Sequence, residues 1–374
     1  MVHPKMKNNC SYFVIKTTLQ ACLIISGMLT YGQDSSKIGT QNQFILSGYA
    51  ETYYTYDFNK PSDNLRPVFF YNHNRHNEFN INLAFIRGTY AADKARATIS
   101  IAVGTYMNAN YAAEPSTLKN VYEANIGFRL TKKNMWLDMG VLPSHIGFES
   151  ATGKDCWTLT RSILADNTPF FESGARISYT NDNGKLFVSG MALNGWQRIT
   201  RVSGSSLMSF GTQIQYRPDS KTTFNYSTFI GTDKPDSSRL NRFYHNLYTI
   251  LQVSNNVGIT AGFDIGSEQQ SKGNRKHNIV YSPVLISKYT INNKWAMAAR
   301  AEYYNDKNGV LITTRSPHGF QTIGYSINLD YSPNSNMLIR VEGRSLHSKD
   351  DIFVRGSSMI SNDSFITSSF AVSF

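Results

Sequence analysis

The stretch 323–331, IGYSINLDY, alternates apolar and polar or small side chains without a break. Its odd positions hold Ile, Tyr, Ile, Leu and Tyr, and its even positions hold Gly, Ser, Asn and Asp. Successive side chains of a β-strand point to opposite faces, so this period of two predicts a strand with one apolar and one polar face.

The same alternation recurs along the chain and predicts sixteen strands, most of them nine to thirteen residues long. A tilted strand needs about 9–11 residues to cross a bilayer, whereas strands of globular proteins usually have about 5–6. The runs at 186–194, 242–253 and 279–289 alternate least clearly. The predicted strands are 44–56, 78–90, 96–106, 120–130, 135–143, 172–180, 186–194, 208–216, 222–231, 242–253, 257–267, 279–289, 295–304, 320–331, 337–346 and 364–374.

Short and long connections alternate between these strands. Seven short links carry turn residues such as Asn183-Gly184, and eight longer links separate them. Short turns at one rim and long loops at the other are typical of outer-membrane barrels. We therefore expect an all-β, antiparallel up-and-down transmembrane barrel of about sixteen strands, with both chain ends on the periplasmic side.

The two faces of the strands favour a barrel over a soluble β-sandwich. The apolar rows end in aromatic residues, such as Trp295 and Tyr331, at the position where amphipathic rings meet lipid headgroups. The last strand places Phe370, Val372 and Phe374 on one face and ends on an aromatic residue. This ending looks like the signal by which barrels are delivered to their assembly machinery. The alternative is that these aromatic residues form an ordinary β-core.

The N-terminal segment has the order of a secretory signal. Lys5, Lys7 and Lys16 precede an apolar stretch at 21–29, and small residues follow up to Gly32. We expect a signal peptide at 1–32 cleaved after Gly32, a short periplasmic segment at 33–43 and the barrel at 44–374. Three lysines leave with the leader, so the net charge falls from +11 to +8.

The composition excludes several classes of protein. Aromatic residues make up 13% of the chain and charged residues 17%, which argues against disorder. A membrane-spanning helix needs about 20 consecutive apolar residues, and only the leader comes near this length, so a helical membrane protein is excluded. The basic residues form no compact run, so nucleic acid is not an expected partner. We expect no cofactor.

The block 141–174, VLPSHIGFESATGKDCWTLTRSILADNTPFFESG, resembles the β-barrel porin type 2 (OmpL-like) family, in which a strand ends in Leu-Pro before a long internal segment. The opening Gly48-Tyr49-Ala50-Glu51 strand and the terminal Phe374 also fit this family. The resemblance covers the mature chain and implies a porin-like barrel in the outer membrane of a diderm (Gram-negative) bacterium. It implies no particular substrate.

A barrel of sixteen strands leaves an aqueous channel unless something fills it. The longest loop, 144–171, follows the fifth strand, and we expect it to fold inward and narrow the pore. Residues 157–164 are expected to form one or two helical turns with Asp155 as a cap. The alternative is a loop that packs over the outside of its neighbours. Its charged residues are Glu149, Lys154, Asp155, Arg161 and Asp166.

The polar rows of the strands are expected to add charges to the lumen. Opposite charges across a constriction favour small polar solutes, but the two signs are too evenly balanced here to predict an ion preference. The alternative is that these residues pair with each other and brace the wall. The cations are Arg96, Arg129, Arg176, Arg300, Arg340 and Arg344, and the anions are Glu51, Glu123, Asp138, Glu172, Asp264, Glu302, Asp330 and Glu342.

No other motif predicts a catalytic or metal site. His73 and His76 lie in a long loop without ligands at metal spacing, so solvated histidines are expected. Cys156 is the only cysteine of the mature chain, has no evident catalytic partner and is expected to pack within its loop.

Three functions fit this sequence. The first is a porin through which ions and small polar solutes diffuse, without covalent chemistry. The second is a barrel enzyme, a phospholipase or acyltransferase, which would need a Ser-His-Asn arrangement on its lipid side. The third is a non-conducting structural barrel or adhesin. The expected partners are outer-membrane lipid, the assembly machinery, small solutes and further copies of the chain in a homo-oligomer.

Overall fold

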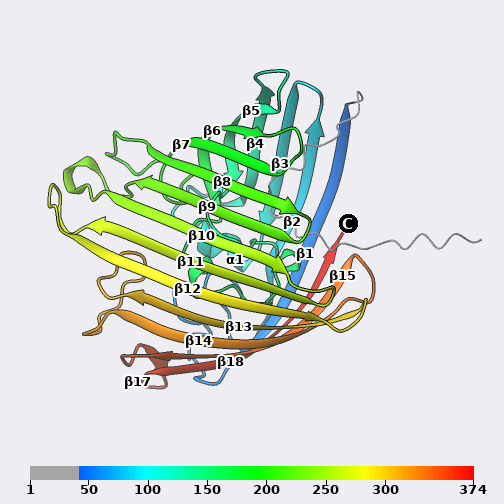
Figure 1. The fold of residues 1–374 in the computed structure, drawn as a ribbon. Helices are drawn as coiled ribbons and strands as arrows, with labels where there is room; N and C mark the ends of the chain where they lie inside the picture. Colours follow the sequence, from blue (N-terminus) through cyan, green and yellow to red (C-terminus); the bar gives the residue numbers. More distant parts are fainter. Residues whose placement is uncertain (1–41) are drawn as a thin grey trace, which may run out of the picture.

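The computed structural model describes residues 42–374, in which sixteen long antiparallel strands close into one barrel (Figure 1). Neighbouring strands follow the chain order, and β18 completes the ring by pairing with both β15 and β1. The strands of the wall are β1 (Gln43–Asp57), β2 (Phe79–Ala91), β3 (Ala95–Val103), β4 (Val121–Arg129), β5 (Met135–Pro143), β6 (Phe171–Thr180), β7 (Leu186–Leu193), β8 (Ser209–Asp219), β9 (Thr222–Gly231), β10 (Arg242–Gln252), β11 (Val257–Gln269), β12 (His277–Thr290), β13 (Trp295–Asp306), β14 (Phe320–Tyr331), β15 (Met337–Ser348) and β18 (Asn362–Ser373).

Several short elements lie in the long loops. A hairpin of β16 (Phe353–Arg355) and β17 (Ser358–Ile360) stands apart from the barrel sheet. The helices are α1 (Thr105–Asn110), α2 (Ile163–Asp166) and the 3₁₀ turns η1 (Leu118–Asn120), η2 (Gly153–Asp155) and η3 (Asp236–Ser238). None of the helices within residues 42–374 has the length and apolar character needed to span a membrane.

The sixteen predicted strands are all confirmed, and three of them, β5, β9 and β14, have the predicted bounds. The largest errors, of three residues each, are at the end of the predicted strand 208–216, where β8 continues to Asp219, and at the end of the predicted strand 96–106, where β3 ends at Val103. Gly104 has a φ of 130°, which turns the chain out of the strand and into α1. The hairpin of β16 and β17 was not predicted. The expected leader at 1–32, with its cleavage site at Gly32, lies outside the described residues.

The alternation seen in the sequence separates the outside of the barrel from its lumen. On β14 the outward-facing Tyr325, Ile327 and Leu329 are exposed, while Ser326 and Asn328 between them are buried inside. β12 alternates poorly in sequence because its inward-facing side chains are also apolar. Val280, Val284 and Ile286 pack into a core inside the barrel.

The first and last strands close the barrel. The Gly48 amide donates to the Phe374 carbonyl at 2.8 Å, and the Phe374 amide donates back to the Gly48 carbonyl at 3.0 Å. The Phe374 ring lies over Gly48, and a Cβ at residue 48 would displace the ring from this position. Phe370 and Phe374 are exposed on the outer surface.

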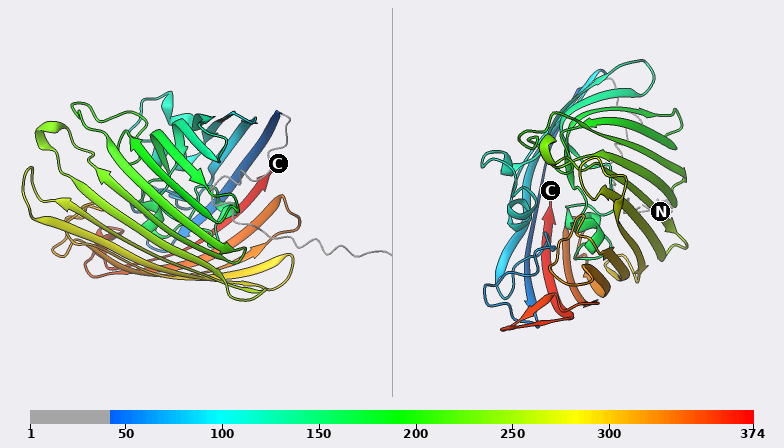
Figure 2. Two further views of the ribbon diagram at one scale, coloured as in Figure 1. Left: turned by 45° about the horizontal axis from the view of Figure 1, so that its top comes forward. Right: turned by 90° about the vertical axis from the view of Figure 1, so that its left-hand side faces the viewer.

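The lumen is largely filled with protein. Two apolar clusters inside the wall combine inward-facing strand residues with loop residues such as Phe69, Phe70, Phe148 and Trp157. In the end-on view of Figure 2, blue-green segments of the chain lie within the ring of strands. The loops between β1 and β2 and between β5 and β6 supply most of the loop residues of the larger cluster, and Trp196, Val310, Ile312 and Phe353 come from other long loops.

Candidate pore and its internal loop

The segment 144–170 connects β5 to β6 and lies inside the barrel (Figure 2). We call it the lumen loop. The expected inward fold is confirmed by its hydrogen bonds to inward-facing residues of β13 and β15 on the far side of the ring. That it narrows a conducting pore remains a prediction.

Arg340 on β15 binds the backbone of the lumen loop. Its guanidinium donates to four carbonyl oxygens between residues 153 and 158, at N···O distances of 2.9–3.2 Å. The same group donates to both carboxylate oxygens of Asp330, each at 2.8 Å. Each of the five N–H groups of the Arg340 guanidinium has an acceptor nearby, so the side chain is buried without an unpaired N–H donor.

Thr160 is held by two strands at once. Its amide and hydroxyl donate to the Glu342 carboxylate at 2.8 and 2.5 Å, and its carbonyl accepts from Arg300 at 2.6 Å. Arg300 and Glu342 also bind each other at 3.0 Å. Charge-assisted hydrogen bonds of this kind are about twice as strong as neutral ones.

A second ion pair anchors the start of α2. Glu302 accepts from the Ile163 amide at 2.7 Å and from Arg344 at 2.5 Å, and Arg344 also donates to the Arg161 carbonyl at 2.8 Å. The Ser162 side chain caps α2 by accepting from the Ala165 amide. The prediction of helical turns over 157–164 capped by Asp155 is therefore wrong. The carbonyls of residues 156–158 are bound by Arg340, which leaves them unavailable to a helix.

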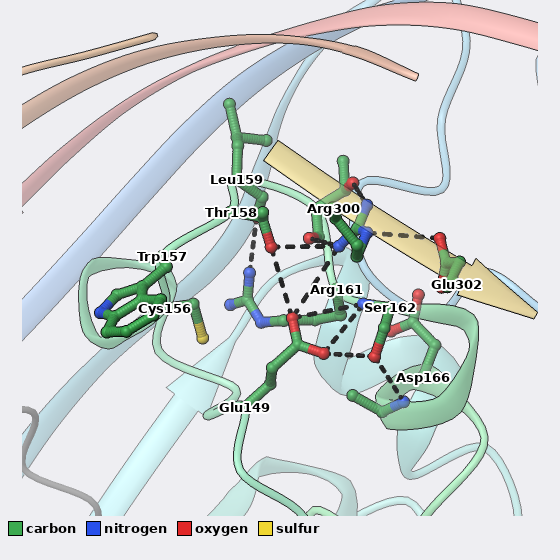
Figure 3. A network of polar contacts seen from close by, with 12 residues as sticks. Glu149, Cys156, Trp157, Thr158, Leu159, Arg161, Ser162, Asp166, Arg300 and Glu302 are labelled. Atoms are coloured by element: carbon green, nitrogen blue, oxygen red, sulfur yellow. Dashed lines mark hydrogen bonds and ion pairs between the residues drawn. The ribbon is translucent and has the colours of Figure 1, made fainter. Parts of the chain in front are cut away.

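Two charged residues stabilise the lumen loop from within (Figure 3). Arg161 donates to the carbonyls of Ser150, Leu159 and Ala151 at 2.6, 2.6 and 3.0 Å. Glu149 accepts from the amide and the hydroxyl of Ser162. Hydrogen bonds within the lumen loop therefore stabilise its conformation, in addition to those that attach it to the wall.

The lumen loop reaches the end of the barrel where the short turns lie. Lys154 Nζ donates to the Ser335 carbonyl at 2.7 Å, in the turn between β14 and β15, and to the Ser373 hydroxyl at 2.5 Å, at the end of β18. Since the loop leaves the wall at the opposite end, it extends through the height of the lumen.

Free space remains on the other side of the lumen loop. A cavity of about 100 Å³ lies between residues 143–155 of the chain and the inner face of the wall from β2 to β10. Its wall-side polar lining includes Arg87, Glu123, Arg176 and Gln213. This cavity lies alongside the lumen loop and is the candidate passage.

Charges of both signs line the candidate passage. On the wall, Arg87 lies 3.3 Å from Glu123, and Arg176 shares Asp138 with Arg96. The loop side contributes Glu149 and Asp155. Burial raises the pKa of Asp155 to about 6, so its charge changes within the physiological range.

Eight predicted constriction residues lie away from the candidate passage. They are buried within the protein, and their role in a constriction remains a prediction. They anchor the lumen loop or hold their neighbours, as the bracing alternative expects. The eight are Arg161, Asp166, Asp264, Arg300, Glu302, Arg340, Glu342 and Arg344. Of the other four, Glu149, Asp155 and Arg176 line the passage, and Lys154 binds the turn between β14 and β15.

The remaining wall charges are also paired. Asp264 accepts from Tyr244 and Asn246 at 2.9 and 2.6 Å. Arg129 binds Asp93 at 2.8 Å beside a short turn, and Glu172 binds the ring of His145 at 2.7 Å. These pairs stiffen the wall and its junction with the lumen loop.

The histidines of the first long loop were predicted to be solvated, and this prediction is wrong. His73 is fully buried with its Nε2 3.5 Å from Glu51, and His76 Nδ1 accepts from the Asp57 amide at 2.9 Å. Burial lowers the pKa of both rings, which keeps them neutral. Nothing in their local sequence shows that this loop also folds into the barrel.

Sequence reasoning also missed residues of the passage. Arg87, Gln213 and Gln215 line it although they were not proposed as pore residues. Gln213 and Gln215 lie in the polar row of β8, which is the signal that would have found them. Arg87 follows Leu83 and Phe85 in its row of β2, so its sequence context gives no such signal. A separate cleft of about 970 Å³ lies between the long loops near Asp63, Arg315 and Asp351.

The described residues offer no metal site and no reactive cysteine. No group of three or more His, Cys, Asp or Glu side chains within 42–374 is arranged to hold a metal ion. Burial raises the pKa of Cys156 to about 11, and its Sγ donates to the Ser150 carbonyl at 3.2 Å. This thiol packs within the lumen loop, as expected.

Residues 43–374 match the family model described as beta-barrel porin-2, OmpL-like. No curated protein matches the chain in sequence. Among solved structures, the outer membrane channel DcaP of Acinetobacter baumannii has a TM-score of 0.61 at 12% identity, over 90% of this chain and 99% of that one. An anion-selective porin from Comamonas acidovorans has a TM-score of 0.58 at 8% identity, over 89% and 100%. The trimer form of OmpT from Vibrio cholerae has a TM-score of 0.57 at 9% identity, over 89% and 99%.

Proposed function

Since the chain belongs to the beta-barrel porin-2, OmpL-like family, we propose that this porin-like outer-membrane barrel is a channel for passive diffusion of ions and small polar solutes. The candidate passage beside the lumen loop carries this proposal. It lies inside a closed barrel, and charged and amide side chains line it. No covalent step is required.

The geometry of the passage favours small solutes with polar groups. Arg87 and Arg176 lie on the wall, and Asp155 lies on the loop side. Opposite charges on two sides of a narrow passage create a field across it, which penalises apolar solutes. Their near balance supports a weakly selective channel.

Conductance measured in planar bilayers tests the proposal. The purified, folded protein is expected to give discrete conductance steps, and the reversal potential in a salt gradient gives its ion preference. A protein that is folded and inserted yet gives no steps would contradict the channel.

A non-conducting structural barrel is the second candidate, because the lumen loop and its wall partners occupy much of the lumen. The same bilayer experiment separates the two candidates. If the protein is a non-conducting structural barrel, the parent chain would give no conductance steps, while a variant without the lumen loop would conduct.

We also propose the remaining features of the mature protein. Residues 1–32 form a cleaved leader, residues 33–43 form a short periplasmic segment, and Phe370, Val372 and Phe374 form the assembly signal. N-terminal sequencing of protein from outer membranes would begin at Gln33 if this is correct. The OmpT neighbour is described as a trimer, which supports a homo-oligomer, and chemical cross-linking in membranes would detect it.

A further inference from the structure

A polar group of side chains lies on the outer face of the barrel at the ends of β15 and β18 that adjoin the long loops. On β15 and β18, His347 lies opposite Asn362 and Ser345 lies opposite Ser364 in the strand pairing. His347 Nδ1 and Asn362 Oδ1 are 2.7 Å apart, and the two serine hydroxyl oxygens are 2.9 Å apart. Three of the four residues are exposed and Ser364 is half-buried.

This polar group borders lipid-facing residues on β14. Tyr325 is the neighbour of Ser345 in the strand pairing, and Ile323 is the neighbour of His347. Tyr325 is 55% exposed and Ile366 on β18 is 46% exposed, on the same outer surface. At the other end of the group, β15 passes into a loop that begins with the exposed Lys349. The group therefore lies where acyl chains give way to lipid headgroups and water.

We propose that Ser345, His347 and Asn362 form an acyl-ester hydrolase site that acts on membrane lipids from the outer surface of the barrel. Asn362 accepts a hydrogen bond from the Nδ1–H of His347, which leaves Nε2 as the basic nitrogen. Ser345 lies two residues away on the same face of β15, within about 7 Å along the strand. Hydrogen bonds between nucleophile and base are often long before substrate binds. The site is separate from the proposed channel.

The chemistry follows the general logic of a serine hydrolase. Ser345 Oγ attacks the ester carbonyl carbon while its proton passes to His347 Nε2. The bond to the lipid alcohol then breaks, and His347 returns the proton to that oxygen, releasing the lysolipid. A water molecule attacks the acyl-serine ester and gives its proton to His347, which passes it to Ser345 Oγ as the fatty acid leaves. The Ser364 hydroxyl lies 2.9 Å from Ser345 Oγ and would donate a hydrogen bond to the negative carbonyl oxygen.

The barrel offers a matched control on its far side. His245 on β10 also faces outward, and its Nδ1 lies 2.8 Å from the Tyr226 hydroxyl on β9. Its neighbour in the strand pairing is Thr228, which is not a serine. His245→Ala therefore removes an outward-facing, hydrogen-bonded histidine without touching the proposed site.

A fluorophosphonate probe and a phospholipid substrate test the proposal on the full chain. The protein is purified from a host without its own outer-membrane phospholipase and assayed with dioleoylphosphatidylcholine in mixed micelles. We expect a covalent adduct on Ser345 and fatty-acid release. Ser345→Ala and His347→Ala should lose the adduct and slow release at least about 100-fold, the usual contribution of a general base, while H245A matches the parent chain.

Asn362 positions the ring of His347, and the effect of substituting it is measured in the pH dependence of the fatty-acid release rate. Asn362→Asp keeps the acceptor for His347 but adds a negative charge, which favours the protonated ring and moves the acidic limb of the rate profile to higher pH. The proposal is overturned if the folded parent chain forms no adduct, if the adduct lies on another residue, or if the release rate is the same in Ser345→Ala. Bilayer conductance of Ser345→Ala should equal that of the parent chain, so failure here is distinguishable from failure of the channel.

Discussion

A single buried arginine holds much of the lumen loop. Arg340 binds four carbonyls of residues 153–158 and the carboxylate of Asp330, and it is almost fully buried. Removing one partner of a buried ion pair leaves the other charge unpaired, which costs about 3–5 kcal/mol. The loop depends on this side chain because its own residues form few backbone hydrogen bonds with each other in that stretch.

We expect Arg340→Ala to release the lower part of the lumen loop. Trypsin should then cleave after Lys154 or Arg161 in the folded protein, single-channel conductance should rise, and the free energy of unfolding should fall by about 3–5 kcal/mol. Arg315→Ala, in an exposed long loop, is the control and should change none of these. An uncleaved loop in Arg340→Ala would show that the other anchors suffice.

Asp155 should make the ion preference depend on pH. Its pKa is raised to about 6 by burial, so the carboxyl group is neutral below that pH and negative above it. The permeability of cations relative to anions is therefore expected to rise between pH 5 and pH 7. Reversal potentials in a salt gradient measure this change, and Asp155→Asn should abolish it. A pH dependence that persists in the variant would assign it to another group.

At the scale of the element, the lumen loop is expected to limit conductance. Replacing residues 153–163 with a short Gly-Ser linker removes the bonds to Arg340, Arg300 and Glu342 while the strand pairs of the wall remain. The variant should still form a barrel and conduct several-fold more current per channel in planar bilayers. Equal conductance of the two chains would mean that the loop does not limit the flow.

Most of the strands could be predicted from sequence because they repeat a two-residue pattern imposed by lipid outside and polar groups inside. β5, β9 and β14 were predicted to the residue. The path of the lumen loop is not determined by a repeating pattern in its own sequence. Thr160 takes its conformation from Glu342, which is 182 residues further along the chain. Partners at that separation leave no periodic trace in the sequence.

The candidate site was partly predictable for the same reason. The charged residues of the lumen were found because they occupy the polar rows of the strands. Which of them face the passage depends on the side of the barrel to which the lumen loop is bound. Arg300 and Arg176 look alike in sequence, yet the first is sealed beneath the loop and the second lines the free space.

The whole molecule is expected to behave as a closed barrel on gels. Every wall strand pairs with two neighbours, so no edge remains where unfolding in detergent can begin. Unboiled protein in dodecyl sulfate should migrate at a different apparent mass from boiled protein. Cleavage between β9 and β10 would leave the unboiled mobility unchanged, because the ladders hold both fragments. A single mobility under both conditions would contradict the closed barrel.

The bonds from Lys154 to Ser335 and Ser373 place the tip of an inner segment against the last strand, next to the seam where the first and last strands meet. A bulky folded segment cannot be threaded easily through a ring that is already shut. Folding would then follow a fixed order. The connection between β5 and β6 would take its place inside the sheet before closure, and the last strand would pair with the first strand afterwards.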